Sequence, residues 1–321
     1  MKMGFSSTRR AFQRQLLCGV GSAAAWPLAR AAEASAAPLK VVATFSVLAD
    51  IAREVGGSAI EVSALVGPNA DAHVFEPTPS DVRRVAGADV VVTNGLRFEG
   101  WIDRLIKASG YRGPVVVASR GVALRQLSGG ADPHAWQDLA NGQRYAENIR
   151  AALVAALAVK SPERAAEVDT RAAAYLQRLA ALDRDIRARI AAVPAERRRV
   201  ITSHDAFGYF AAAYGITFIA PRGWTTGSEP SADAVARIVR QARDAKASAL
   251  LVENISDPRL IDRIAREAGL KVGGKLYSDA LSLPGTDADT YLRMFEHNVR
   301  TLVEAMSALS TRPAAASGNP P

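Results

Sequence analysis

The chain has 321 residues, of which 49% are apolar and 22% charged, and its mean hydropathy is close to zero. This composition is typical of a soluble globular protein long enough for two lobes, and it excludes a protein built mainly of membrane-spanning helices. The formal charge is +8, but the first 32 residues carry five basic side chains and no acidic one. The +3 that remains is small for this length, so the charge does not predict a nucleic-acid partner.

Residues 1–36 are typical of an export signal that is removed after transport. Arg9 and Arg10 form a twin-arginine pattern, and the run from Leu16 to Leu28 is weakly apolar and too short to anchor the mature protein in a bilayer. An ordinary secretory signal with an accidental arginine pair is the alternative. With either signal, we expect the protein to leave the bacterial cytoplasm and to work in the periplasm.

The only cysteine, Cys18, lies inside this predicted signal. The residues before it, Gln15 to Leu17, lack the small side chains that lipoprotein processing prefers, so we do not expect a lipid anchor. The mature chain then contains no thiol, and it can neither form a disulfide nor offer a thiolate to a metal. Any metal site in it must be built from nitrogen and oxygen ligands.

Strand and helix patterns alternate in the first part of the mature chain, which we assign to an N-terminal lobe over residues 37–160. One helix has a common start, with Thr78 at the N-cap position, Pro79 at the first helical position and Asp81 in the first turn. Such βα alternation is typical of a parallel sheet covered on both faces. The predicted strands are 40–45, 60–66, 90–95 and 114–119, and the predicted helices are 47–56, 78–88, 99–110 and 140–158.

A long amphipathic helix is predicted over residues 162–193, within a linking region that we assign to 161–194. Apolar residues recur there at spacings of three and four, which places them on one face of a helix. About 30 residues at 1.5 Å each give roughly 45 Å, longer than one small lobe is wide. A helical hairpin or a coiled-coil arm is the alternative. Because strand and helix patterns alternate again directly afterwards, we expect this helix to join two lobes.

We assign residues 195–310 to a C-terminal lobe and residues 311–321 to a disordered tail. The predicted strands are 198–204, 216–221, 249–254 and 271–279, and the predicted helices are 205–215, 231–247, 257–269 and 290–308. The expected fold class is α/β, with two lobes whose central sheets are mostly parallel, joined by a single long rigid helix. A ligand is expected in the cleft between the lobes, at the carboxyl ends of the strands.

Three of the four histidines lie in short loops that follow predicted strands, whereas His297 lies inside an amphipathic helix pattern. The three are His73, His134 and His204, and Asp279 ends a strand in the same way. Because two of these four residues come from each half of the chain, we expect them to converge between the lobes. A lone loop histidine is more often a hydrogen-bonded surface residue, but three at matching points of the topology favour a transition-metal site.

Three imidazoles and one carboxylate suit Zn²⁺, which prefers four tetrahedral ligands, better than Mn²⁺, which prefers more oxygen. Four protein ligands leave little room for a reacting water, so the pattern favours a carrier over an enzyme. The competing hypothesis is a zinc hydrolase with Glu253 or Asp205 as its general base, although the chain has no HExxH motif. A third hypothesis, a surface adhesin, requires an anchor that we do not find in the sequence.

Four further residues are candidates for contacts that support the ligands. Glu76, Asp132 and Asp205 each lie within three residues of a candidate histidine, and a ligating histidine usually donates its second N–H to a carboxylate or a carbonyl. For Asp132 or Asp205 taken alone, a role in a turn or a helix start is the more common explanation. Trp136 lies beside His134 and is expected to line the cleft.

The segments DAHVFEPTPSD, DPHAW, SHDAFGYF, GSEPSA and SDAL occur in this order across nearly the whole mature chain. In these motifs the chain resembles the zinc- and manganese-binding solute receptors of ABC importers, the cluster A-I or TroA-like family. The resemblance implies two α/β lobes joined by a rigid helix and a partner permease in the inner membrane. It also implies that the metal ligands are His73, His134, His204 and Asp279. Manganese-type members usually carry Glu at the position of His204, so the resemblance favours a zinc receptor, with a manganese receptor as the alternative.

One region departs from the zinc-type members, many of which carry a loop rich in histidine and acidic residues before the DPH motif. The corresponding stretch, residues 119–131, is short and contains no histidine. A zinc metallochaperone is a candidate partner by resemblance, but we do not expect this loop to scavenge metal or to accept it from a chaperone. We expect the protein to act as a monomer and to bind no nucleic acid.

Overall fold

The structure is a computed structural model, and it describes residues 37–307 apart from 128, 160, 222, 224, 228, 229 and 245–248. The predicted export signal (1–36) and the predicted tail (311–321) therefore lie outside the described residues. Within the described part of the chain, no helix combines the length and the apolar character that a membrane span requires.

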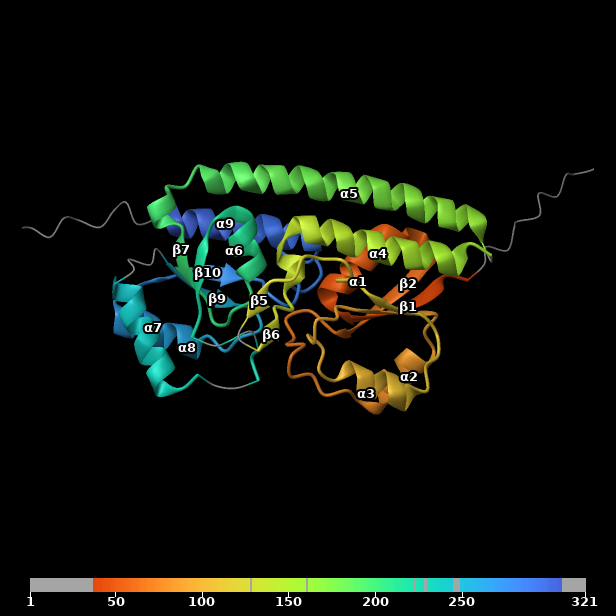
Figure 1. The fold of residues 1–321 in the computed structure, drawn as a ribbon, viewed down its shortest axis with the longest axis horizontal. Helices are drawn as coiled ribbons and strands as arrows, with labels where there is room; N and C mark the ends of the chain where they lie inside the picture. Colours follow the sequence, from red (N-terminus) through yellow and green to blue (C-terminus); the bar gives the residue numbers. More distant parts are fainter. Residues whose placement is uncertain are drawn as a thin grey trace, which may run out of the picture. The chain divides into compact units, whose positions relative to one another are not determined.

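The first sheet is fully parallel, with four strands in the order β2-β1-β3-β4. Its strands are β1 (Leu39–Phe45), β2 (Ile60–Val66), β3 (Val90–Thr93) and β4 (Val115–Val117). Every residue of β3 is buried, as expected for an inner strand that is covered on both faces. The helices between these strands are α1 (Ser46–Gly56), α2 (Pro79–Ala86) and α3 (Ile102–Ser109) (Figure 1).

The second sheet is also parallel and has the order β10-β9-β7-β8. The strands are β7 (Arg199–Ile201), β8 (Thr217–Ile219), β9 (Ala249–Glu253) and β10 (Val272–Leu276). Strands β1 and β7, which come first in the two halves of the chain, each lie at an inner position of their sheet. The helices are α6 (Gly208–Tyr214), α7 (Ala232–Asp244), α8 (Arg259–Ala268) and α9 (Tyr291–Ser307).

Helix α6 begins three residues later than the sequence pattern predicts. Residues 202–207 form an irregular loop instead, because the carboxylate of Glu253 accepts the backbone N–H groups of Ser203 and His204. These two N–H groups are thereby held toward β9. Because α6 begins only at Gly208, His204 lies in a loop after the end of β7.

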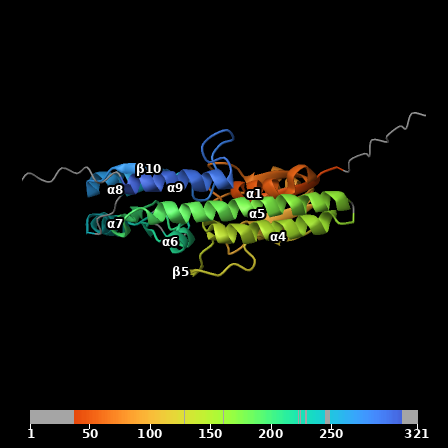
Figure 2. The ribbon, with the colours of Figure 1, turned by 90° about the horizontal axis from the view of Figure 1, so that it is seen from above.

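Two long helices, α4 (Leu139–Leu157) and α5 (Pro162–Ala191), lie side by side (Figures 1 and 2). Helix α5 contacts α1 of the first lobe and α6 and α9 of the second, so it packs along both lobes. This helix therefore links the two lobes. The division into residues 37–160, 161–194 and 195–310 stays a prediction. The buried face of α5 consists of Ala165, Val168, Ala172, Tyr175, Leu179, Ile186 and Ile190.

A short antiparallel hairpin, absent from the predicted elements, lies between β4 and α4. It consists of β5 (Gln126–Leu127) and β6 (Gly130–Ala131). Gly129 and Gly130 have φ angles of 118° and 137°, which glycine adopts far more readily than other residues. This hairpin lies within residues 119–131, the stretch that contains no histidine.

A buried carboxylate connects α1 to the start of α9. Asp50 is 3% exposed, and its Oδ2 atom accepts a hydrogen bond from the backbone N–H of Tyr291 at 2.7 Å. Burial raises the pKa of Asp50 to about 6, against 3.8 for the ordinary side chain, although the Tyr291 N–H opposes the rise. The folded protein therefore holds this proton more tightly than the unfolded chain does.

Replacing Asp50 by asparagine is expected to stabilise the protein at neutral pH but not in acid. Because the folded-state pKa lies above the unfolded one, the parent protein loses stability as the pH rises through the range between these values. A shift from 3.8 to about 6 corresponds to a loss of up to ~3 kcal/mol. Asparagine has no charge to desolvate and still accepts the Tyr291 N–H. Urea unfolding of both metal-free proteins near pH 4 and near pH 8 checks this, and a stability difference that does not change with pH would contradict it.

Candidate metal centre

Four side chains from distant parts of the sequence meet at one point. His73, His134, His204 and Asp279 each contribute one ligand atom to a group in which all four atoms lie within 4.8 Å of one another. The Oδ2 atom of Asp279 lies 3.1 Å from Nε2 of His73 and 3.2 Å from Nε2 of His204. The Nε2 atoms of His73 and His134 are 3.4 Å apart. All four side chains are at most 1% exposed, so the space that they enclose is shielded from solvent.

Each of the four residues lies in a segment that follows the carboxyl end of a strand. His204 follows β7, Asp279 follows β10, and His73 lies in the turns after β2. His134 comes after β4 and the hairpin, just before a single helical turn (Ala135–Gln137). Because parallel strands end at the same edge of a sheet, each lobe brings two of the four residues to one edge.

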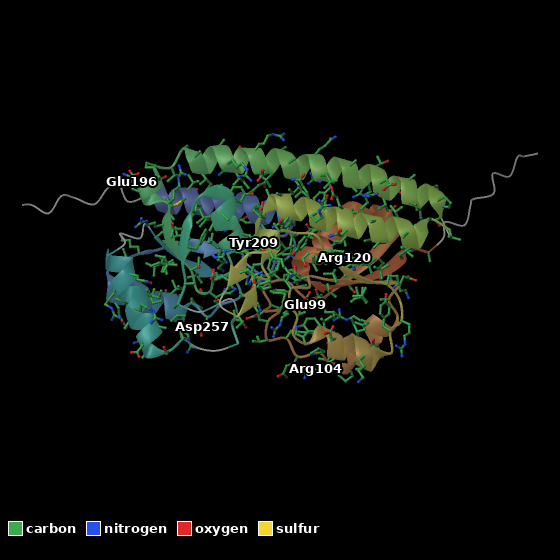
Figure 3. The ribbon with its side chains drawn as sticks, viewed as in Figure 1. Glu99, Arg104, Arg120, Glu196, Tyr209 and Asp257 are labelled. Atoms are coloured by element: carbon green, nitrogen blue, oxygen red, sulfur yellow. The ribbon has the colours of Figure 1, made fainter. Side chains whose placement is uncertain are left out.

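Asp132 holds His134 through both its backbone and its ring. The Oδ1 atom accepts the His134 backbone N–H at 3.0 Å and lies 2.8 Å from Nδ1 of the ring. This contact leaves Nε2 facing the other three ligands. The Oδ2 atom of Asp132 accepts a hydrogen bond from Arg125 at 2.7 Å, and the backbone N–H of Arg125 donates to the hydroxyl of Tyr209 in α6. Tyr209 is labelled in Figure 3. The support of His134 therefore extends from the hairpin to the second lobe.

Glu253, at the end of β9, contacts both the ring and the backbone of His204. Its Oε2 atom lies 2.7 Å from Nδ1 of His204, and its Oε1 atom accepts the backbone N–H groups of Ser203 at 2.8 Å and His204 at 2.9 Å. Glu253 is 1% exposed. In the hydrolase hypothesis, Glu253 was a candidate general base. Both of its carboxylate oxygens, however, face His204 and the adjoining backbone. The sequence indicates this supporting role only through the position of Glu253, at the end of a strand that reaches the same sheet edge as His204.

Trp136 and Gln137 connect the His134 segment to the Asp279 segment. Both side chains donate to the carbonyl oxygen of Ser278, at 3.0 Å and 2.7 Å respectively. The ring of Trp136 also lies 5.3 Å from that of His134, measured between centroids. Trp136 therefore packs beside one ligand and positions the residue that precedes another.

Two of the predicted supporting residues do not lie against the ligands. Glu76 is exposed, and within the described part of the chain the carboxylate of Asp205 makes no hydrogen bond to a candidate ligand. Asp205 follows His204 directly, and its backbone N–H donates to the carbonyl of Gly223. Closeness in sequence therefore does not by itself place a carboxylate against an imidazole. His297 lies outside the site and donates to the carbonyl of Lys275 at 3.0 Å.

The charges at this point suit a bound cation. Burial by itself would raise the pKa of Asp279, but His204 and His134 hold that pKa well below its usual range. Burial by itself would lower the pKa of His204, but the carboxylates of Glu253 and Asp279 raise that pKa well above its usual value. The Oδ1 atom of Asp279 is buried and accepts no hydrogen bond from the described residues. A divalent cation would satisfy this oxygen and take the place of the proton on His204.

Replacing Asp132 by asparagine is expected to weaken zinc binding by about 10–100-fold, which is usual when the carboxylate behind a ligating histidine is lost. The amide would keep the shape of the side chain but not the charge that orients the imidazole. Asp205→Asn is the matched control, and we expect it to leave the affinity within about twofold. Competition with a chelator of known affinity measures both. An unchanged affinity in D132N would show that Asp132 does not support the site.

The fold and the site together define a class of protein, a two-lobed α/β receptor with a buried cation-binding site. The chain belongs to the family described as "Zinc-uptake complex component A periplasmic", whose model matches residues 41–305. Members of this family are metal-binding receptors of ABC importers that work outside the cytoplasm.

Similar proteins bear the names of different metals. "Manganese-binding lipoprotein MntA" of Halalkalibacterium halodurans is 33% identical over 270 residues, which cover 84% of this chain and 89% of the relative. "Manganese ABC transporter substrate-binding lipoprotein PsaA" of Streptococcus pneumoniae is 30% identical over 286 residues, which cover 86% of this chain and 91% of the relative. The solved structure of the periplasmic zinc binding protein TroA from Treponema pallidum has a TM-score of 0.78 and 29% identity, and covers 84% of this chain and 99% of that one. The metal is therefore the property that the comparisons leave to be decided.

Proposed function

We propose that this protein is a periplasmic zinc receptor, which binds Zn²⁺ and delivers it to the permease of an ABC importer in the inner membrane. The proposed ligands are His73, His134, His204 and Asp279. The observation that carries the proposal is the donor set, three imidazole nitrogens and one carboxylate whose ligand atoms lie within 4.8 Å of one another. Four such ligands match the tetrahedral preference of Zn²⁺. Zinc is the cargo of this protein, and no reaction is assigned to it.

Manganese is the competing cargo, because MntA and PsaA are named for it whereas TroA is named for zinc. Mn²⁺ is a harder ion that prefers carboxylate, carbonyl and water oxygen. In this chain Asp279 is the one carboxylate among the four candidate ligands. The buried carboxylates of Asp132 and Glu253 face the Nδ1 atoms of histidines instead. This distribution of nitrogen and oxygen favours zinc.

The same contacts suggest how the cargo is held and released. The bonds from Trp136 and Gln137 to Ser278 keep His134 and Asp279 near each other, so zinc would enter a site that is already largely assembled. Helix α5 packs against both lobes, which favours small movements of the ligand loops over a wide opening of the cleft. We propose that release to the permease follows such a movement.

We further propose that the protein acts as a monomer in the periplasm. The twin-arginine pattern of residues 1–36 supports export, and MntA and PsaA are named lipoproteins, which makes anchoring through Cys18 the alternative. Cell fractionation of the parent protein and of Cys18→Ser separates the two. A parent protein in the membrane fraction and a variant in the soluble periplasmic fraction would establish the anchor. A zinc metallochaperone stays a candidate partner, although residues 119–131 hold no histidine to receive its metal.

Isothermal titration of the metal-stripped protein with Zn²⁺ tests the proposal. We expect one zinc ion per chain, and a stoichiometry far from one would count against the receptor. A second titration in the presence of excess Mn²⁺ tests the metal. Mn²⁺ that displaces Zn²⁺ from the protein would overturn the zinc assignment and leave a manganese receptor. The metal content of protein isolated from the periplasm provides an independent check.

A further inference from the structure

The loop that follows β3 has a backbone that needs external support. Gly95, Leu96 and Arg97 have φ angles of 81°, 54° and 63°. Glycine adopts such angles readily, but two consecutive residues with side chains in the left-handed region are unfavourable. Backbone of this kind persists where the surrounding structure holds it, and it is often found at functional sites.

A buried carboxylate provides this support. The Oε1 atom of Glu99 accepts the backbone N–H of Asn94 at 2.6 Å and the hydroxyl of Thr44 at 2.5 Å, and its Oε2 atom accepts the N–H of Gly95 at 3.2 Å. Glu99 is 4% exposed and is labelled in Figure 3. Burial raises the pKa of Glu99, whereas the hydroxyl of Thr44 and the two N–H groups favour its charged form. Successive backbone N–H groups that converge on an anion form a known type of anion-binding turn.

The loop held by Glu99 contacts the metal centre through a hydrogen bond. The side-chain amide of Asn94 donates to the carbonyl of Pro133 at 2.9 Å, and Pro133 directly precedes His134. The amide oxygen of Asn94 accepts the hydroxyl of Tyr145 at 2.7 Å, which fixes the orientation of the amide. The Asn94 side chain therefore defines where the backbone of the His134 segment lies.

The same loop also contacts the imidazoles directly. The ring of Phe98 lies 4.7 Å from that of His73 and 6.0 Å from that of His134, measured between centroids. Both pairs are nearly perpendicular, with interplanar angles of 70° and 74°. Phe98 thus packs against both ligands of the first lobe, and its own position depends on the loop that Glu99 holds.

We propose that Glu99 is a positioning residue for the half of the metal site that the first lobe contributes. By binding the N–H groups of Asn94 and Gly95, it keeps the loop in the shape that sets Asn94 against Pro133 and Phe98 against the two imidazoles. Glu99 is not a ligand, and its effect passes through these two neighbours. This inference rests on the proposed metal-binding function.

The test compares Glu99→Gln with Asp81→Asn. Glutamine has the shape of glutamate, but its NH₂ group would face an N–H donor of the loop. We expect E99Q to bind Zn²⁺ about tenfold more weakly, at the low end of the effect of losing a supporting contact. We also expect the visible absorption spectrum of bound Co²⁺ to change, because that spectrum reports the geometry of the ligands. Asp81 is also buried and accepts the backbone N–H of Thr78 at the start of α2, so D81N serves as the control. We expect D81N to lower stability but to change neither the Zn²⁺ affinity nor the Co²⁺ spectrum.

The outcomes separate this inference from the proposed function. A parent protein that binds no Zn²⁺ would refute the receptor itself. A parent and an E99Q protein with equal affinity and identical Co²⁺ spectra would leave the receptor intact and overturn the role of Glu99. If E99Q does not fold, Thr44→Val removes only one of the donors to Glu99, and an affinity loss of about threefold is then expected. An unchanged affinity in T44V would contradict the proposal in that case.

Discussion

Replacing His134 by alanine is expected to weaken zinc binding by more than about 100-fold, because even a carboxylate behind a ligand is worth about 10–100-fold. The Nε2 atom of His134 lies 3.4 Å from Nε2 of His73 and 3.7 Å from Oδ1 of Asp279, so it belongs to the centre of the group. Without this ring, zinc would keep three protein ligands. The substitution would also leave the buried charge of Asp132 without the imidazole that it contacts.

His297→Ala is the matched control for this experiment, since it removes the one histidine outside the site. Its ring also makes a hydrogen bond, to the carbonyl of Lys275, but we expect its loss to leave zinc affinity within about twofold. Titration calorimetry measures the affinities, and thermal unfolding provides a second reading. Saturating Zn²⁺ should raise the unfolding temperatures of the parent and of H297A. The increase for H134A should be much smaller. An H134A protein that keeps the parent affinity would refute the proposed ligand set.

Zinc affinity is expected to fall by about tenfold for each pH unit of acidification, over the range in which the metal-free protein carries a proton on His204. The metal requires the lone pair of a neutral imidazole, so binding must displace this proton. The pKa of His204 is raised well above its usual value by Glu253 and Asp279, against the opposing effect of burial. The displacement therefore extends to higher pH than it would for an ordinary imidazole, and above the raised pKa this contribution disappears. Over two pH units within that range, the expected loss from this group is about 100-fold.

Calorimetry in two buffers of different ionisation enthalpy, at the same neutral pH, counts the protons released. We expect about one proton per zinc ion from His204. Glu253→Gln removes one of the two carboxylates that raise the pKa of His204, so this variant should release fewer protons at the same pH. A binding heat that is the same in both buffers for the parent protein would contradict the assignment of a proton to His204.

Much of the architecture could be predicted from local patterns, since those patterns have local causes. The alternation of apolar strands and amphipathic helices predicted two parallel sheets, and the 30 residues of α5 form the expected long helix. The four candidate ligands were found because parallel strands bring their carboxyl ends to one edge. That rule depends only on the order of the elements, so it applies to His73, His134, His204 and Asp279 without knowledge of side-chain packing.

The contacts around these ligands were decided by the tertiary structure. Asp205 directly follows His204 yet does not hold it, whereas Glu253, distant in the sequence, lies 2.7 Å from its ring. Glu99 and Phe98 gave no signal in the sequence, because their role depends on a loop with positive φ angles that brings them to the His134 segment. The order of strands along the chain decides which segments meet at a sheet edge. The direction in which a side chain points, and the partner that it meets, depend on loop geometry and on packing between segments far apart in the chain.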